Sequence, residues 1–570
     1  MKKSFILSFL LAVSLIAPSF AFAQSGSSLK LVARQPDRIA AANKTAKSPV
    51  TMENIESDMA EALTLVQDNY VNGKKLDYNE LFKSSIEGML HTLDPHSNYF
   101  DAKEFEAFTT EQQSQYFGIG ATIGDLREGE TTWTYIRATF PDAPAYRAGL
   151  RYGDKIVEVN GVSMKDKPYF DVRNNLRGPR GTTAKLLVER NGTKELKTVE
   201  IVRDAVPQPS IPEAYMIRPG VGYIAMTGGF NQTTSAEFAE AMQELKTQGM
   251  KQLVLDLRNN GGGLVREALR VASAFLAKGQ IIFTQKGRVP GTDGKYPSNN
   301  PNPDDTPLVI LVNRNTASAS EILSGALQDH DRALIIGEPT FGKGLVQNPF
   351  PLPYNSALLL TIAKYQTPSG RTIQRDYSNG NLYDYYTQGG TFHDENGNKK
   401  PTGPESRTDT GRIVYGGGGI APDENVKPAT LNVLEQRLNL PIFSFALDLT
   451  AGKVNGFANL KDDRAIDFEH DFKSTELPVS DELFAAFKKF VAGKEDYKGF
   501  SVAQLDKERE YISRQIRYEL ATAAYGATAS FRVYNEADPQ IMRAVELFPK
   551  AQQLAKTAAQ MRTTAKTPVN

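Results

Sequence analysis

The chain has 570 residues, of which 40% are hydrophobic and 23% are charged, and its 66 basic residues balance 66 acidic residues. These proportions exclude wholesale disorder and a membrane protein with many spans, and the balanced charge gives no reason to expect a nucleic acid as partner. Because the chain has no cysteine, it has no thiol nucleophile, no thiolate metal site and no disulfide. At about 150 residues per domain, its length predicts about three or four domains.

The first residues have the pattern of a secretory signal peptide. Two lysines precede an apolar run over residues 5–16, and an Ala-Phe-Ala sequence stands just before Gln24. We expect residues 1–23 to be removed, because the apolar run is shorter than the roughly 20 residues of a membrane span. The protein is therefore expected to be exported, with the periplasm favoured as its location, either free or peripheral to the membrane.

Three further segments follow in order. Residues 24–50 are rich in Ser, Ala, Lys and Gln without periodicity, so they are expected to form a linker. Residues 51–112 place apolar side chains at helical intervals, as at Leu63 and Val66, which predicts a small helical domain. Residues 113–206 change to short β-rich runs separated by Gly, Asp and Asn, which predicts a compact β-module.

Residues 207–430 are expected to form an α/β core. Apolar strands at about 253–257 and 308–312 alternate with amphipathic helices there, and a stretch rich in Gly, Asn and Asp over about 376–410 is typical of an insertion. Residues 431–570 are mostly helical in pattern. The predicted fold class is therefore multidomain α/β, with a helical segment, a β-module, an α/β core and a C-terminal helical region.

Ser318 is expected to lie at the turn between the strand at 308–312 and the helix that follows. Such a turn directs backbone N–H groups and the positive end of the helix dipole toward the side chain, which suits a developing oxyanion. The alternative is that Ser318 or Ser320 only caps the helix, which is a common role of serine.

Lys343 is a candidate general base. If the chain is extended from Gly344, the side chains of Lys343 and Gln347 share one face, because side chains alternate along a strand. A lysine accepts a proton only when neutral, so an apolar site must lower its pKa from about 10.4, and the neighbouring amide can orient it. The alternative is a solvated surface lysine.

The same segment partly fits a phosphate-binding P-loop. Residues 337–343 match its first seven positions, but Gly344 stands where a Ser or Thr should bind magnesium. Pro339 disrupts the loop, and Pro349 opposes the helix that should follow it. We therefore expect no nucleotide as ligand.

A third segment, residues 255–263, reads as a strand that enters a glycine turn (residues 259–263). Glycines permit close approach of a ligand to the backbone. The N–H of Gly262 or Gly263 is a candidate for one half of an oxyanion hole, with the Ala319 N–H as the other half. The alternative is a tight turn that only requires positive φ.

Three segments together carry a resemblance to a known family: Leu-Asp-Leu-Arg-Asn-Asn-Gly-Gly-Gly at 255–263, Thr-Ala-Ser-Ala-Ser-Glu-Ile at 316–322 and Thr-Phe-Gly-Lys-Gly-Leu-Val-Gln at 340–347. Their sequences, order and spacing resemble the carboxyl-terminal processing, or tail-specific, peptidase family. The resemblance implies a serine endopeptidase with Ser318 as nucleophile, Lys343 as base and Gln347 as the amide that orients the lysine. It implies no metal and no cofactor.

A second resemblance lies upstream, where Gly118-Ile119-Gly120 and the motifs that follow resemble the PDZ domain of the same family. In such modules a Gly-x-Gly turn receives the terminal carboxylate of a peptide, which adds to the sheet as a strand. Gly118, Ile119 and Gly120 are therefore expected to bind protein or peptide substrates with free, largely apolar C-termini. The alternative is an ordinary β-turn, and an adaptor or a homo-oligomer is left open.

The implied mechanism is acyl transfer, in which Lys343 takes the proton of Ser318 and the acyl-enzyme is released by water. Activity should then rise with pH through a single ionisation. The competing functions are a catalytically silent PDZ scaffold, which the intact Ser318, Lys343 and Gln347 disfavour, and an acyl-thioester enzyme of related core architecture, which would not need a PDZ module.

Two other constellations are weaker. His330 lies between two aspartates, but proximity in the chain does not place a base at Ser318. His91 and His96, with Asp94, suggest a metal site, yet they lack the i, i+4 spacing of a helical metal pair. We expect a structural role for His91 and His96, and no triad role for His330.

Overall fold

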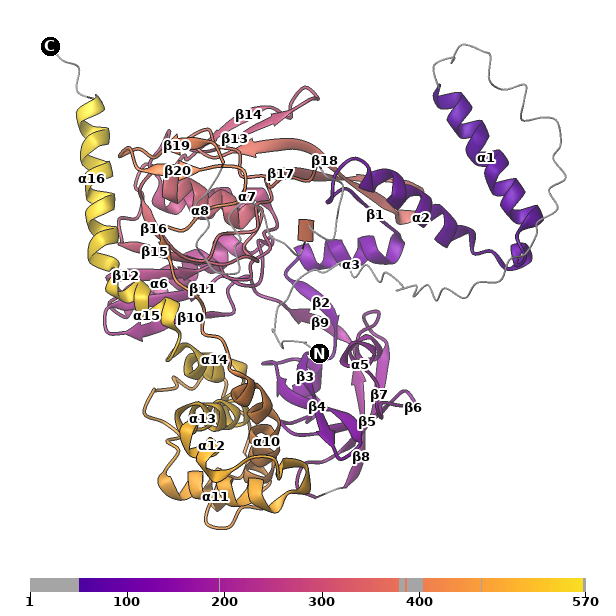
Figure 1. Cartoon of the computed structure of the whole chain (residues 1–570), viewed down its shortest axis with the longest axis vertical. Helices are drawn as coiled ribbons and strands as arrows, with labels where there is room; N and C mark the ends of the chain where they lie inside the picture. Colours follow the sequence, from indigo (N-terminus) through magenta and orange to yellow (C-terminus); the bar gives the residue numbers. More distant parts are fainter. Residues whose placement is uncertain (1–50, 194, 379–384, 387–402, 463, 567–570) are drawn as a thin grey trace, which may run out of the picture. The chain divides into compact units, whose positions relative to one another are not determined.

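A computed structural model describes residues 51–193, 195–378, 385–386, 403–462 and 464–566. The predicted signal peptide and linker, residues 1–50, lie outside the described residues, as does most of the predicted insertion. The chain forms two compact units that divide between Tyr99 and Phe100. The multidomain α/β fold class predicted from the sequence is confirmed (Figure 1).

The first unit is helical. Helix α1 (Met52–Asn69) begins at Thr51, whose side chain accepts a hydrogen bond from the helix, and α2 (Tyr78–His91) begins at Asp77 in the same way. Such caps satisfy N–H groups that have no partner within the helix. Every side chain of α1 lies at least partly in solvent, so tertiary burial contributes little to this helix.

The histidine cluster of the sequence forms a turn. The Asp94 carboxylate accepts hydrogen bonds from the backbone N–H groups of His96 and Ser97, both at 2.8 Å, and from the Ser97 hydroxyl at 2.6 Å. Asp94 therefore closes the turn after α2, which is a structural role.

An antiparallel sheet forms the β-module of the second unit. Its strands lie in the order β3 (Ala121–Glu128), β4 (Thr131–Thr139), β5 (Lys155–Val159), β7 (Thr183–Glu189) and β8 (Leu196–Val202), with β6 (Val162–Ser163) beside β5. Strand β3 is at one edge, next to α5 (Tyr169–Leu176). The inward side chains form their own apolar core with α4 (Pro144–Arg147) and α5. Helix α3 (Ala102–Gln112) and the paired strands β2 (Gln115–Gly118) and β9 (Asp204–Pro207) flank this module in sequence.

A largely parallel sheet forms the α/β core. Its strands run in the order β10 (Glu213–Arg218), β11 (Val221–Ala225), β12 (Gln252–Asp256), β15 (Leu308–Val312), β16 (Ala333–Gly337) and β21 (Glu424–Asn425), with only β10 antiparallel. Strands β11, β15 and β16 are buried throughout, as is typical of a parallel sheet covered on both faces. One face packs on α6 (Thr234–Thr247), α7 (Val265–Phe275) and α8 (Ala319–Asp329).

A second, antiparallel sheet carries the lysine segment (residues 340–347) into the core. Strand β17 (Leu345–Pro351) pairs with β18 (Ala357–Gln366), which pairs with β13 (Ile281–Gly287), and β13 pairs with β14 (Gly294–Pro297). A small ribbon of β19 (Glu405–Arg407) and β20 (Ile413–Tyr415) follows.

The C-terminal helical region (residues 433–566) contains α10 (Val433–Thr450), α11 (Asp481–Gly493), α12 (Val502–Lys507), α13 (Arg509–Tyr525), α14 (Ala527–Asn535), α15 (Pro539–Glu546) and α16 (Phe548–Lys566). Helices α10 to α13 enclose an apolar core of their own. Helices α15 and α16 instead cover the second face of the parallel sheet. The last helices therefore complete the fold of the α/β core.

The C-terminal helical region also binds the β-module. Phe443 of α10 packs in one apolar cluster with Tyr135 and Tyr152 of the β-module. Glu519 of α13 forms an ion pair with Arg137 and accepts a hydrogen bond from the Tyr152 hydroxyl at 2.7 Å. One helical region thus contacts both the β-module and the α/β core.

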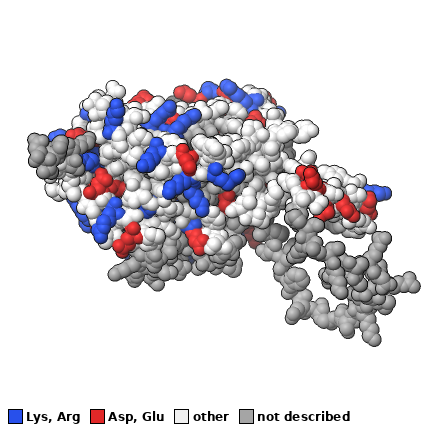
Figure 2. All heavy atoms as spheres, turned by 90° about the horizontal axis from the view of Figure 1, so that it is seen from above, with Lys and Arg blue, Asp and Glu red and all other residues white. Residues whose placement is uncertain are grey.

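Two surface features bear on the predictions from composition. On the face drawn in Figure 2, Lys and Arg side chains are interspersed with Asp and Glu side chains, in line with the balanced charge. Among the described helices, none combines the length and the apolar content that crossing a bilayer requires.

Candidate active site

Ser318 lies between β15 and α8, at the strand-to-helix turn that the sequence predicts. Its backbone has φ 57° and ψ −116°, a combination that a residue with a side chain rarely adopts. Such strain persists only where the surrounding structure enforces it, and it is concentrated at active sites. The side chain is half-buried, so it can be reached from solvent.

The glycine turn holds this conformation. The Asn260 carbonyl accepts hydrogen bonds from the Ala317 N–H at 2.9 Å and from the Ser320 hydroxyl at 3.0 Å. A Cβ at Gly262 would lie 2.7 Å from the Ser318 Cβ, and Gly262 has φ +99°. Only glycine therefore lets the two turns approach so closely.

The predicted oxyanion donors differ in availability. Ala319 is the first residue of α8, where N–H groups have no partner within the helix. The Gly262 N–H, however, donates to the Asn260 side-chain oxygen at 2.9 Å, so this donor is engaged in the present arrangement. Gly263 is exposed beside it and is left as the glycine donor.

Lys343 and Gln347 meet as the sequence predicts. The Lys343 ammonium donates a hydrogen bond of 2.7 Å to the Gln347 side-chain oxygen, and both residues are half-buried. This occurs although the pairing of β17 with β18 shifts register between Val346 and Gln347. The amide therefore fixes the direction of the lysine.

Glu321 joins the nucleophile to the lysine segment. One carboxylate oxygen accepts hydrogen bonds from the Ser318 and Lys343 N–H groups, both at 2.8 Å. The other accepts from the Gly342 N–H at 2.7 Å and from the Thr340 hydroxyl at 2.5 Å. Burial raises the pKa of Glu321 to about 7, against the lowering effect of these four donors.

Tyr365 of β18 makes a second link between the same segments. Its hydroxyl lies 3.1 Å from the Ser318 carbonyl oxygen and 2.9 Å from the Lys343 carbonyl oxygen. Burial holds the pKa of this phenol well above its usual value, so it remains a hydrogen-bond donor. The buried side chains of Glu321 and Tyr365 thus fix the position of the candidate nucleophile relative to the candidate base.

Neither link was foreseen from the sequence. For Glu321 a signal exists, because a Ser followed three residues later by Glu is a helix-capping pattern. Its contacts to Gly342 and Lys343 are beyond any local pattern. For Tyr365 the sequence offers no signal, since a tyrosine in a strand is ordinary.

Comparison with known proteins agrees with this geometry. A model of peptidase family S41 matches residues 220–384, and a PDZ domain model matches residues 136–190. A carboxy-terminal-processing protease of Bartonella bacilliformis is 36% identical over 52% of this chain and 68% of its own length. The carboxy-terminal processing protease CtpB of Bacillus subtilis is 31% identical, over 63% of this chain and 74% of its own length. A carboxyl-terminal-processing protease of Synechocystis is 34% identical, over 55% and 72%.

The chain belongs to peptidase family S41 and is a serine protease. In this protease the β-module is a PDZ domain. The C-terminal helical region lies outside the residues that either family model matches.

His330 of the protease is engaged away from Ser318. Its Nδ1 lies 2.9 Å from the Asp409 carboxylate and its Nε2 lies 2.8 Å from the Ile281 carbonyl oxygen. It follows α8, whereas Ser318 precedes it, and a helix of 11 residues is about 16 Å long. Both ring nitrogens of His330 are therefore engaged with groups other than Ser318.

The predicted peptide-binding turn of the protease directly precedes edge strand β3. Gly118 ends β2, and the Ile119 carbonyl accepts a hydrogen bond from the Ala145 N–H at 2.7 Å. Gly120 has φ +75°, and a Cβ there would lie 2.3 Å from the Ala143 Cβ. The turn thus needs glycine at this position, and it stands at the start of an edge next to α5.

Proposed function

We propose that this protease is exported, captures the exposed, largely apolar C-termini of proteins in its PDZ domain, and hydrolyses peptide bonds with Ser318 as nucleophile and Lys343 as base. The observation that carries the proposal is the buried Glu321 carboxylate, which binds the backbones of both residues. A strained serine held in register with an amide-oriented lysine is an arrangement suited to nucleophilic catalysis.

The proposed reaction has two steps. The neutral amine of Lys343 accepts the Ser318 proton as the serine oxygen attacks the scissile carbonyl, while the N–H groups of Ala319 and Gly263 stabilise the oxyanion. The protonated lysine then donates its proton to the leaving amine. In the second step Lys343 takes a proton from the water that attacks the acyl-enzyme and donates it to the leaving Ser318 oxygen, so the acid product departs and both residues return to their starting state.

Recognition is proposed to occur at edge strand β3. An extended peptide can add to this edge beside α5, with its terminal carboxylate at the N–H groups of the turn formed by Gly118, Ile119 and Gly120. The main-chain hydrogen bonds supply affinity, and an apolar final side chain supplies selectivity. Substrates are therefore proteins or peptides with a free C-terminus.

Tail dependence tests this recognition. We compare three forms of one unfolded reporter protein, which end in an apolar tail, in the same tail as an amide, and in two aspartates. Binding is measured by fluorescence anisotropy with the Ser318→Ala variant, and cleavage by mass spectrometry with the unaltered protein. We expect the apolar free tail to bind and be cut, with roughly tenfold or greater loss for the other two. Equal cleavage of all three would refute tail recognition, and binding without cleavage would favour a PDZ scaffold.

The pH dependence tests the base. Because only neutral Lys343 accepts a proton, kcat/KM should rise with pH along a single ionisation curve between roughly pH 5 and pH 10. Initial rates on a short fluorogenic peptide give the profile. A profile that stays flat over this range would contradict Lys343 as the general base.

A further inference from the structure

Arg258 joins the candidate oxyanion loop to the C-terminal helical region. It directly precedes the glycine turn, and its guanidinium contacts the Asp256 carboxylate at 2.6 to 3.0 Å. Its Nη1 reaches in the other direction, to the Asp538 carboxylate at 2.6 Å and to the Gln540 side-chain oxygen at 2.7 Å. The two partners in the C-terminal helical region are thus 280 and 282 residues away along the chain.

This network is largely removed from water. The exposed fractions of the side chains are 14% for Arg258, 3% for Asp256 and 8% for Asp538. Burial alone lowers the pKa of the Arg258 guanidinium, but attraction to the two carboxylates outweighs burial and raises it. A buried charge that loses one partner is costly, so the position of Arg258 depends on Asp538.

The residues on either side of Arg258 hold the nucleophile turn. The Leu257 carbonyl accepts a hydrogen bond from the Thr316 hydroxyl at 2.8 Å. The Asn259 N–H donates to the Asn313 side-chain oxygen at 2.9 Å, and the Asn259 side-chain oxygen accepts from Asn313 and Asn315, both at 2.9 Å. A displacement of Arg258 would therefore also move the glycine turn and the residues that precede Ser318.

Asp538 and Gln540 are themselves fixed. The second oxygen of Asp538 caps α15, accepting from the N–H groups of Gln540 and Ile541 at 2.8 and 3.1 Å. The Gln540 amide donates to the Val426 carbonyl at 2.6 Å, and its side chain is fully buried. These contacts leave both acceptors with one orientation toward Arg258.

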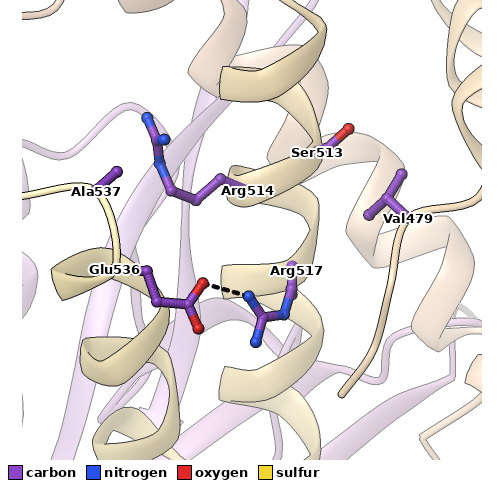
Figure 3. A pocket seen from close by; sticks show the side chains of 6 residues that line it. All are labelled: Val479, Ser513, Arg514, Arg517, Glu536 and Ala537. Atoms are coloured by element: carbon purple, nitrogen blue, oxygen red, sulfur yellow. Dashed lines mark hydrogen bonds and ion pairs between the residues drawn. The ribbon is translucent and has the colours of Figure 1, made fainter. Parts of the chain in front are cut away.

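The residues just before Asp538 are also held in place by helix α13. A small pocket of about 270 Å³ lies between α13 and the residues just before Asp538. Arg514, Arg517 and Ala537 are among the residues that line it (Figure 3). Arg517 of α13 forms an ion pair with Glu536 across it. Helix α13 is also the helix that contacts the PDZ domain through Glu519.

We propose that Asp538 and Gln540 are positioning residues for peptide-bond hydrolysis, which act by holding Arg258 and, through it, the oxyanion loop and the nucleophile turn. The inference rests on the proposed function of Ser318. It assigns the C-terminal helical region a part in the reaction itself, in addition to covering the sheet.

The variant Asp538→Asn tests this inference. Asparagine caps a helix as well as aspartate does, so α15 should be retained while Arg258 loses one of its two charged partners. We expect kcat on a short peptide to fall about 10- to 100-fold, because small misplacements of catalytic groups have effects of this size. KM and binding of an apolar tail to the PDZ domain should be unchanged. Gln540→Leu should act in the same direction with a smaller loss.

The matched control is Glu546→Gln, which removes an exposed carboxylate from the same helix, where it forms an ion pair with Arg543. Its kcat should equal that of the unaltered protein. All rates are expressed per folded molecule, from thermal unfolding followed by circular dichroism, so that partial unfolding does not imitate the effect.

The outcomes separate this inference from the function on which it rests. If the unaltered protein does not cut, or if Ser318→Ala cuts equally well, the proposed function fails. If the unaltered protein cuts, Ser318→Ala does not, and Asp538→Asn retains full kcat per folded molecule, only the positioning role is overturned. If Asp538→Asn instead raised KM and left kcat unchanged, the positioning role would be overturned as well.

Discussion

Replacing Ser318 by alanine should reduce kcat by roughly 10⁴- to 10⁶-fold, because the residue supplies the only atom proposed to attack the substrate. Lys343→Ala should cause a loss of similar order, since no other described group is proposed to take the serine proton. The loss in the double variant should not exceed that of Ser318→Ala, because residues that act as one unit have strongly non-additive effects. Cleavage of an unfolded reporter with an apolar tail, followed by mass spectrometry, gives the rates.

A matched control exists for the lysine. Lys364 is exposed on β18, where it pairs in register with Leu345, two residues after Lys343. Lys364→Ala should retain full activity. Thermal unfolding of all variants should agree closely, because Ser318 and Lys343 are only half-buried. If Lys343→Ala cut as fast as Lys364→Ala, the base would be misassigned.

Replacing Glu321 by glutamine should reduce both stability and activity. Both oxygens of the carboxylate accept two hydrogen bonds each, from Thr340, Gly342, Ser318 and Lys343. An amide keeps one acceptor oxygen and places an NH₂ group against two donors. Each buried donor left without an acceptor costs about 1–3 kcal/mol, so we expect the free energy of unfolding to fall by about 2–5 kcal/mol.

Activity should fall with it, because the same bonds set the positions of Ser318 and Lys343. We expect kcat to decrease by about 10²-fold or more in Glu321→Gln, measured per folded molecule. Glu338→Gln is the control, since this carboxylate lies near the same segment but pairs with the exposed Arg314. Equal kcat in the two variants would show that the Glu321 contacts do not position the reacting groups.

The raised pKa of Glu321 gives this prediction a pH dependence. Burial raises the pKa from its usual 4.5 to about 7, so between these values the folded chain binds more protons at this site than the unfolded chain. The contribution of Glu321 to the free energy of unfolding therefore decreases as the pH rises from about 4.5 to about 7. The free energies of unfolding of the unaltered protein and of Glu321→Gln, measured by urea unfolding, should therefore differ less at about pH 7 than at about pH 4.5.

Much of the fold was readable from local patterns. The buried apolar runs before Ser318 and before the glycine turn predicted two strands of an α/β core, and these are found side by side as the parallel strands β12 and β15. The turn after β15 was expected to hold the nucleophile, and the strained φ of Ser318 is found there. These features are predictable because strand burial and turn chemistry act over a few residues.

The sequence was less informative about which groups are available. It left Gly262 and Gly263 as equal candidates for the oxyanion hole, and only the three-dimensional structure shows the Gly262 N–H donating to Asn260. Whether a donor is free depends on which side chain packs against it, and that is a property of the folded turn.

By itself, the sequence determined the α/β fold class, the order of the domains it predicts, and the family, because each follows from residues that are close together or from motifs in a set order. Tertiary structure alone decided what holds the active site. By sequence alone, Glu321 and Asp538 have the pattern of helix caps. In the folded chain Glu321 also accepts a hydrogen bond from the Lys343 N–H, and Asp538 also pairs with Arg258, which lies 280 residues away in the sequence. Such contacts are formed by packing of distant elements, and no local periodicity or spacing encodes them.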